Sequence, residues 1–312
     1  MRPVRPPATV QRSVLSVSAY HQHTVAGPAI FAGLGLHTGE HVRVAVRPAA
    51  IDAGVVFVRT DVKDRDNQVR VSAEAVVKTQ LGTVIGNAAG VTVSTIEHLM
   101  AALAALSVDN AIVELDGPEL PILDGSSQPF IEILDRVGRR RQEAARRYIE
   151  MLDTVEVVDG DKRASLSPSD QFEVAFEIAF DAAPIGRQRV DLVVDEDSFR
   201  EELADCRTFG FARDVETLRA MGLARGGSTD NAVVLDGDRI LNPEGLRRPD
   251  EFVRHKALDA VGDLYVLGMP IIGRFDGLYA GHGLNNMVVR ELLAKPQAWR
   301  VRTWTEELAV AV

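Results

Sequence analysis

The stretch FVRHKALDAVGDL, residues 252–264, holds the side chains with the clearest chemical potential. His255 is followed by Asp259 four residues later and by Asp263 eight residues later. On a helix these three side chains drift by only about 80° in total, so His255 and Asp259 are neighbours and can hold one ion. From this stretch alone, the alternative is an amphipathic helix with a solvated polar face.

A second pair of reactive side chains opens an apolar stretch, STIEHLMAALAAL, residues 94–106. Neighbours on a helix point about 100° apart, so one of Glu97 and His98 can bind a metal while the other reaches the water on it. Taken alone, Glu97 forms a capping box with Ser94, and His98 is a packed core histidine. We expect Ser94 or Thr95 to start the helix without help from Glu97.

His282 lies between Gly281 and Gly283 in the stretch YAGHGLNN. Flanking glycines keep the backbone open and the neighbouring residues small, which a core histidine does not need. This setting favours a histidine that faces a ligand.

Together these residues supply a metal site with catalytic groups beside it. His98, His255 and Asp259 offer two imidazoles and one carboxylate, which suits a catalytic zinc with one position left for water. The same set suits a non-haem Fe(II) site. Glu97 is then a spare base and His282 a spare acid, a combination that favours metal-assisted hydrolysis over oxygen chemistry.

Composition limits the class of protein. The chain has 312 residues, of which 46% are hydrophobic, so we expect about two domains with a substantial core. No window approaches an apolar membrane span, and the basic, Pro-rich start has no apolar region typical of a secretory signal. The single cysteine, Cys206, excludes intrachain disulfides and fits a cytosolic protein. A net charge of −10 without a basic stripe argues against a nucleic-acid partner.

Alternating and apolar patterns predict an α+β fold in two similar halves. The first half reads as strands at 40–49 and 54–62, a turn at 87–90, a helix at 95–106, a strand at 110–117 and a helix at 125–138. The second half reads as three strands within 148–180, helical pieces at 197–211 and 215–227, a strand at 231–237, a helix at 248–268, and a strand, turn and helix over 271–294.

The stretches NAIVELDG and NAVVLDG echo each other between the halves and hint at two domains of similar build, with a ligand cleft between them. The first domain is expected to supply Glu97 and His98, and the second to supply His255, Asp259 and His282. The predicted division is a disordered extension at 1–24, a first domain at 25–138, a solvated linker at 139–147, a second domain at 148–301 and a tail at 302–312.

Six motifs occur in a fixed order along the chain: GLGLHTGE (33–40), STIEHLMAALAAL (94–106), PILDGSSQPF (121–130), CRTFGF (206–211), FVRHKALDAVGDL (252–264) and GHGLNN (281–286). Over roughly residues 25–300 the chain thereby resembles the UDP-3-O-acyl-N-acetylglucosamine deacetylases, the zinc amidases of lipid A biosynthesis. The resemblance implies two α+β domains around a zinc cleft, each with an insert region. It also implies one Zn²⁺ per chain and cytoplasmic hydrolysis of the 2-acetamido group of UDP-3-O-(3-hydroxyacyl)-N-acetylglucosamine, which is the committed step of that pathway.

The resemblance also implies a role for each matched residue. His98, His255 and Asp259 are the zinc ligands, Glu97 is the general base, and His282, oriented by Asp263, is the cationic general acid. Thr208 donates a hydrogen bond to the developing oxyanion, and Lys256, Phe209 and Phe211 line the substrate site.

The chain departs from the family pattern at several points. It has about 20 extra N-terminal residues, Gly82 stands where some relatives have cysteine, and Tyr279 stands where some have a cation, so Lys256 becomes the expected diphosphate contact. We expect no fused dehydratase domain. The alternating stretch 172–186 is either a hydrophobic channel for the acyl chain or an ordinary core strand.

Two other functional classes stay open at this point. One is a zinc amidohydrolase for a different N-acylated substrate, and the other is a non-catalytic sugar-nucleotide-binding protein. The end of the chain, TEELAVAV (305–312), reads either as a degradation signal for a regulatory protease or as a disordered terminus. Nothing in the sequence requires more than a monomer.

Overall fold

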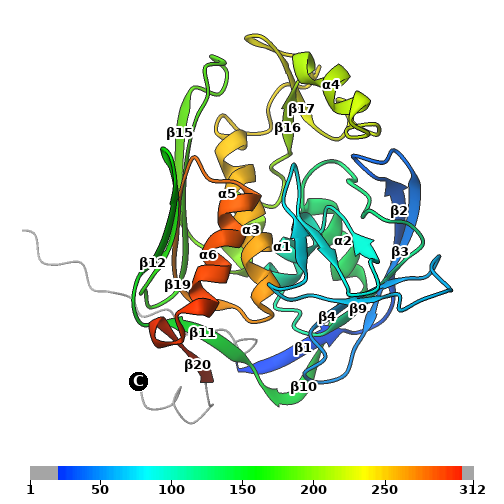
Figure 1. Ribbon diagram of the computed structural model, residues 1–312, viewed down its shortest axis with the longest axis vertical. Helices are drawn as coiled ribbons and strands as arrows, with labels where there is room; N and C mark the ends of the chain where they lie inside the picture. The colour runs from blue at the N-terminus through cyan, green and yellow to red at the C-terminus, as the bar shows by residue number, and fades with distance from the viewer. Residues whose placement is uncertain (1–19, 304–312) are drawn as a thin grey trace, which may run out of the picture.

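Two β-sheets face each other across a layer of helices in a computed structural model, which describes residues 20–303. Figure 1 shows α1 (Glu97–Ala105), α5 (Glu251–Leu264) and α6 (His282–Ala294) between the two sheets. This arrangement confirms the predicted α+β fold. No helix among the described residues is long and apolar enough to cross a membrane.

The first half builds a five-stranded sheet in the order β2-β3-β9-β4-β5. Its strands alternate buried and more exposed residues, so one face packs on the helices. The elements of this half are β1 (His21–Val25), β2 (Ala29–Leu34), β3 (His41–Pro48), β4 (Val55–Arg59), β5 (Gln68–Arg70), β6 (Val76–Lys78), β7 (Val84–Gly86), β8 (Thr92–Val93), α1, β9 (Ala111–Leu115) and α2 (Gln128–Val137).

The second half builds a seven-stranded sheet in which β12, β13, β19, β11 and β20 follow one another, β14 also pairs with β19, and β15 pairs with β14. All strands of this half, in that sheet and outside it, are β10 (Arg139–Ala145), β11 (Arg147–Met151), β12 (Val155–Asp159), β13 (Lys162–Ser167), β14 (Phe172–Ala179), β15 (Arg187–Val193), β16 (Phe209–Phe211), β17 (Val233–Asp236), β18 (Arg239–Ile240), β19 (Ile271–Leu278) and β20 (Trp299–Thr303). Its helices are α3 (Glu196–Glu202), α4 (Val215–Ala220), α5 and α6, with short 3₁₀ turns η2 (Ala212–Asp214), η3 (Tyr265–Leu267) and η4 (Pro296–Ala298).

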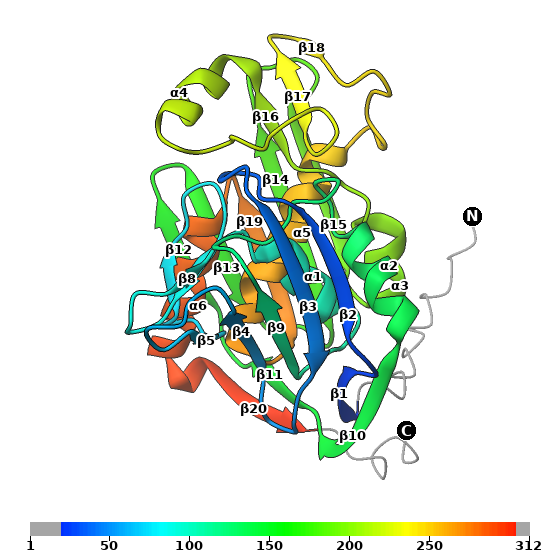
Figure 2. The same cartoon turned by 90° about the vertical axis from the view of Figure 1, so that its right-hand side faces the viewer.

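Each half also carries a small three-stranded sheet, in agreement with the predicted insert regions. In the first half this sheet has the order β6-β7-β8, and in the second it has the order β16-β17-β18. Figure 2 shows the second of these sheets, together with α4, standing above the rest of the molecule.

The two halves meet where α1 packs on α5. Eight of the nine residues of α1 are buried, as expected for a helix that is covered on all sides. At Gly262 of α5, an added Cβ would lie only 2.0 Å from the carbonyl oxygen of Glu97. A glycine is therefore required at this position, and the close backbone contact fixes the first turn of α1 against α5.

Parts of two segments that were predicted to be flexible form strands. Residues His21–Val25 form β1, which pairs antiparallel with β10, Arg139–Ala145. The extension predicted through residue 24 and the linker predicted at 139–147 are therefore wrong for these residues. The error has a physical cause. Most β10 side chains are exposed, as in a solvated linker, and Gln142 is the buried exception. Residues 1–19 and 304–312, including the predicted degradation signal, lie outside the described residues.

The echo between the halves does not mark equivalent strands. The first copy forms β9 inside the main sheet of the first half, whereas the second forms β17 in the small sheet of the second half. The helical piece predicted at 197–211 is also too long, since α3 ends at Glu202 and Phe209–Phe211 form β16. The two halves are alike in architecture, but this short repeat is not the reason.

Candidate active site

The predicted metal ligands converge where α1 meets α5. His98 lies in the first turn of α1, while His255 and Asp259 lie one turn apart on α5, and all three are buried. One ligand atom from each residue lies within 4.8 Å of the others. Oδ1 of Asp259 is 3.4 Å from Nε2 of His98 and 3.3 Å from Nε2 of His255.

The chemistry of these groups suits a divalent cation. Nδ1–H of His255 donates to the carbonyl oxygen of Cys206 at 3.0 Å, which directs its Nε2 lone pair toward Asp259. Burial lowers the pKa of His255 to about 3, so the ring is neutral, as a metal ligand must be. Among the described residues, the buried Oδ1 of Asp259 accepts no hydrogen bond. A cation bound between the three groups would satisfy this oxygen.

Glu97 lies next to the ligand set with only 3% of its surface exposed. Its Oε2 accepts a hydrogen bond from the backbone N–H of Thr83 at 2.9 Å. Burial raises its pKa, against the opposing effect of His282 and His98, which suits a group that takes up a proton.

Glu97 forms no capping box with Ser94. The N-cap of α1 is Ile96, which makes no side-chain cap, and Thr95 has a left-handed φ of 58° with its hydroxyl donating to Glu119 at 3.0 Å. The expectation that Ser94 or Thr95 starts the helix is therefore wrong, and Glu97 has no capping role.

His282 stands at the start of α6 and faces the same region. Its Nδ1–H donates to Oδ2 of Asp263 at 2.8 Å, and its Nε2 lies 3.9 Å from Oδ2 of Asp259. Burial alone would lower the pKa of His282, but the charges of Asp263 and Asp259 raise it to about 9. His282 is therefore a cation at neutral pH with a proton on Nε2.

The remaining predicted site residues surround these groups. Lys256 donates from Nζ to Oδ2 of Asp259 at 2.8 Å and lies 5.8 Å from the ring centroid of Phe209. The backbone N–H of Thr208 donates to the carbonyl oxygen of Gly125 at 2.8 Å, so the PILDG motif fixes the position of Thr208. With Phe211, these residues line one cavity together with the ligand set, Glu97 and His282.

This cavity has a volume of about 580 Å³. One part holds the polar groups described above. Another part of its wall is apolar and includes Leu36, Ile122, Val215, Leu218, Ala224, Ala232 and Val234. A ligand with a reactive polar end and a long apolar end matches such a site.

Comparisons with known proteins identify the family. The family model described as LpxC, UDP-3-O-acyl N-acetylglycosamine deacetylase, matches residues 22–294. The chain belongs to this family.

Three similar deacetylases support the assignment over nearly their full lengths, and each is named UDP-3-O-acyl-N-acetylglucosamine deacetylase. The protein from Phenylobacterium zucineum is 72% identical, over 93% of this chain and 99% of the relative. Those from Shewanella frigidimarina and Myxococcus xanthus are 47% and 48% identical, over 93% and 91% of this chain and 95% and 90% of the relatives.

Two residues in or beside the cavity, His37 and Glu119, were not predicted from the sequence. His37 lines the cavity and donates from Nε2 to the carbonyl oxygen of Leu81 at 3.0 Å. The fully buried Glu119 accepts the backbone N–H groups of His37 and Thr38, both at 2.8 Å. The motif GLGLHTGE marks His37, but a single glutamate 82 residues further on carries no pattern that links the two.

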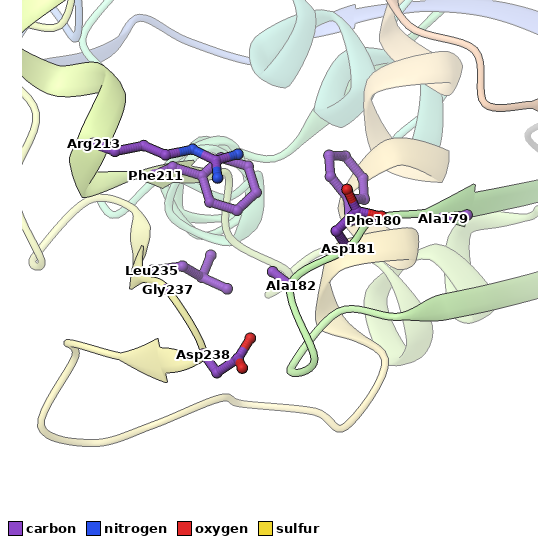
Figure 3. Close-up of a pocket in the computed structure, with 9 residues that line it drawn as sticks. All are labelled: Ala179, Phe180, Asp181, Ala182, Phe211, Arg213, Leu235, Gly237 and Asp238. Carbon is purple, nitrogen blue, oxygen red and sulfur yellow. The ribbon is translucent and has the colours of Figure 1, made fainter.

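A second hollow of about 400 Å³ adjoins the cavity at Phe211, which lines both. Figure 3 shows Phe180 and Phe211 on its walls, with Arg213 beside Phe211; the two rings are 6.0 Å apart and the guanidinium is 4.8 Å from the Phe211 ring. Of the stretch 172–186, only Ala179, Phe180, Asp181 and Ala182 reach this hollow, while β14 is mostly core. The β14 part of the stretch is therefore an ordinary core strand, which is the second of the two predicted alternatives.

Proposed function

We propose that this deacetylase hydrolyses the 2-acetamido group of UDP-3-O-(3-hydroxyacyl)-N-acetylglucosamine to UDP-3-O-acyl-glucosamine and acetate, using one zinc ion held by His98, His255 and Asp259. The observation that carries the proposal is the meeting, in one cavity, of a buried two-imidazole, one-carboxylate set with a raised-pKa carboxyl group and a histidine cation. Family membership supports the substrate. We further propose that this is the committed step of lipid A biosynthesis.

Zinc fits the three donors, which leave a coordination position for water. When bound, it would supply a Lewis acid and lower the pKa of that water toward about 7. The buried Oδ1 of Asp259, which receives no hydrogen bond from the described residues, supports a cation at this point.

The side chains move the protons of the reaction. Glu97 takes a proton from the water as the water oxygen bonds to the acetamide carbon. Thr208 donates a hydrogen bond to the oxyanion that forms. The charge of His282 stabilises the same oxyanion, and its Nε2–H then passes to the sugar nitrogen as the C–N bond breaks. Asp263 keeps His282 charged and holds its ring through the 2.8 Å hydrogen bond to Nδ1.

The rest of the substrate fits the other walls of the site. We assign the acyl chain to the apolar wall of the cavity and the diphosphate to Lys256, which reaches the cavity beside Phe209. The nucleotide then lies toward Phe211 and the adjoining hollow, where aromatic faces and the guanidinium of Arg213 suit a flat base and its phosphates.

The test compares turnover of 3-O-acylated and non-acylated UDP-N-acetylglucosamine by the zinc-loaded protein. We expect efficient release of acetate only from the acylated sugar. Equal turnover of both would favour an amidohydrolase for a different N-acylated substrate. No turnover of any N-acyl sugar, with substrate bound and no zinc in the purified protein, would favour the non-catalytic sugar-nucleotide-binding protein.

The roles of the base and the acid have their own test. Glu97→Gln and His282→Ala should each lower kcat by about 10²–10⁴-fold while zinc stays bound. The exposed Glu74 supplies the matched control, since Glu74→Gln makes the same chemical change away from the cavity. Full activity of Glu97→Gln would contradict the assigned base.

The organisation of the chain remains part of the proposal. We propose two domains, of which 25–138 and 148–301 are the main parts and to which β1 and β10 add a pair of strands. We also propose a monomeric enzyme and a cytoplasmic location, and the single, buried Cys206 supports the location. Regulation by a protease at the C-terminal tail is also a proposal, and a comparison of cellular half-lives with and without residues 307–312 tests it.

A further inference from the structure

Thr83 contacts a reactive carboxylate from each half of the molecule. Its backbone N–H donates to Oε2 of Glu97 at 2.9 Å, and its hydroxyl donates to Oδ1 of Asp263 at 2.6 Å. Thr83 itself is 2% exposed. One residue of the loop between β6 and β7 thus joins the proposed base to the carboxylate that orients the proposed acid.

The loop that carries Thr83 is held in one conformation. Leu81 has a left-handed φ of 59°, and its carbonyl oxygen accepts the Nε2–H of His37 at 3.0 Å. Gly82 has a φ of 153°, and an added Cβ there would lie 2.9 Å from Oε1 of Glu97. On the other side, the carbonyl oxygen of Thr83 accepts the backbone N–H of Ile96. These contacts anchor the loop directly against the first turn of α1.

Each hydrogen bond of Thr83 fixes the rotation of one carboxylate. At Glu97, the bond occupies Oε2 and leaves Oε1 to accept a proton. At Asp263, Oδ1 accepts the Thr83 hydroxyl, while Oδ2 accepts His282 Nδ1–H at 2.8 Å and the side-chain amide of Asn285 at 2.9 Å. With donors on both oxygens, Asp263 has one orientation, and the ring of His282 follows it.

We propose that Thr83 is a positioning residue, which holds Glu97 and the Asp263–His282 pair in a common frame across the two halves. This inference rests on the proposed roles of Glu97 and His282. The hydroxyl of Thr83 is the part of the side chain that acts. Serine should therefore replace it, and valine, which has the same shape without the hydroxyl, should not.

The experiment compares Thr83→Val, Thr83→Ser and the control Thr92→Val in the zinc-loaded enzyme. Thr92 lies in β8 of the same small sheet and makes no hydrogen bond to either carboxylate, so its replacement by valine is the matched change. We expect Thr83→Val to lower kcat by about 10–100-fold, the usual effect of losing a hydrogen bond that orients an active-site side chain. KM and zinc content should stay within about twofold, and Thr83→Ser should recover most of kcat.

A spectroscopic signal separates positioning from a general structural role. The Nδ1–H proton of His282, identified by its loss in His282→Ala, should shift in Thr83→Val and keep its position in Thr83→Ser and Thr92→Val. Melting temperatures set the assay temperature at which every variant is folded. If Thr83→Val does not fold, Thr83→Ala, which also lacks the hydroxyl but has a smaller side chain, takes its place.

The inference fails if Thr83→Val keeps the natural kcat, or if Thr83→Ser is as slow as Thr83→Val. Glu97→Gln, measured in parallel, distinguishes this failure from that of the proposed function. A slow Glu97→Gln with a fully active Thr83→Val overturns the role of Thr83 alone. A fully active Glu97→Gln overturns both.

Discussion

In the first half of the molecule, Glu97 and His98 come from the first turn of α1, whereas in the second half His255, Asp259 and Asp263 are spaced along α5. The spacing of four residues is a property of the helix, so α5 holds its own side chains in relative position. The first turn of a helix has no such internal support, because its backbone is bonded on one side only.

The first half therefore depends on contacts from outside α1. The hydroxyl of Ser127 donates to the carbonyl oxygen of His98 at 2.9 Å, and Thr83 donates to Glu97. Gly262 of α5 contributes by leaving room for the backbone of Glu97. Reactive groups spaced along a helix can be recognised from one segment of sequence, while groups at a helix end are positioned by residues far away in the chain.

The largest expected effect comes from removing one proposed metal ligand in each half. His98→Ala and His255→Ala should both lose zinc and lower kcat/KM by more than about 100-fold. Loss of a hydrogen-bond partner of a metal ligand already lowers metal affinity or activity by about 10–100-fold. Zinc per chain, measured by mass spectrometry, checks this. His41→Ala, at an exposed histidine of β3, is the control. Full zinc content in His98→Ala would mean that the first half supplies no ligand.

An intermediate effect is expected from Gly262→Ala, which leaves every reactive group in place. The added Cβ would lie 2.0 Å from the Glu97 carbonyl oxygen, so α1 must shift. We expect a loss of about 1–3 kcal/mol in the free energy of unfolding and up to about a 10²-fold loss in kcat/KM. Denaturant unfolding and steady-state kinetics measure the two.

Gly27→Ala is the matched control for this change, because an added Cβ there meets nothing within 4 Å. Natural activity and stability in Gly262→Ala would contradict the view that the α1–α5 contact positions the first half.

The smallest expected change is a shift in the pH range of activity, which the shape of the profile shows separately from any loss of rate. In the proposed mechanism His282 must carry a proton, so kcat/KM should fall as the pH rises through its pKa of about 9. Because the charge of Asp263 raises this pKa, Asp263→Asn should move the fall to lower pH, toward the ordinary histidine value of about 6.5. A pH profile of kcat/KM shows the shift. Asp161→Asn, in an exposed turn, should leave the profile unchanged.

Most of the candidate site could be predicted from the sequence because its residues fall in short, ordered motifs. The spacing of His255, Asp259 and Asp263 carries its own geometric meaning, and the glycines beside His282 mark a ligand-facing position. The predicted metal ligands indeed come together, with the predicted base and acid beside them. The α+β class followed from alternating strands and apolar helices.

The remaining features depend on contacts that local sequence does not encode. In the sequence Gly262 is an ordinary helix glycine, and only the structure shows that α1 lies against it. The proposed role of Thr83 likewise depends on two partners, one of them 180 residues away. β10 was missed because its arginines resemble a solvated segment, although β1 pairs with it. The similar stretches NAIVELDG and NAVVLDG led to the opposite error. They suggested equivalent strands, but they form strands in different sheets.

The burial of α1 against α5 also has a consequence for how the chain is made. When the ribosome has added His98, more than half of the chain, including all of α5, is still to be synthesised. At about 5–20 residues per second, α1 waits on the order of ten seconds for its partner. During that time Leu99, Met100 and Leu103, which end up fully buried, lack part of their final cover. Completion of the active site is therefore a late event in biosynthesis, and a nascent chain stalled before α5 presents apolar surface to chaperones and proteases.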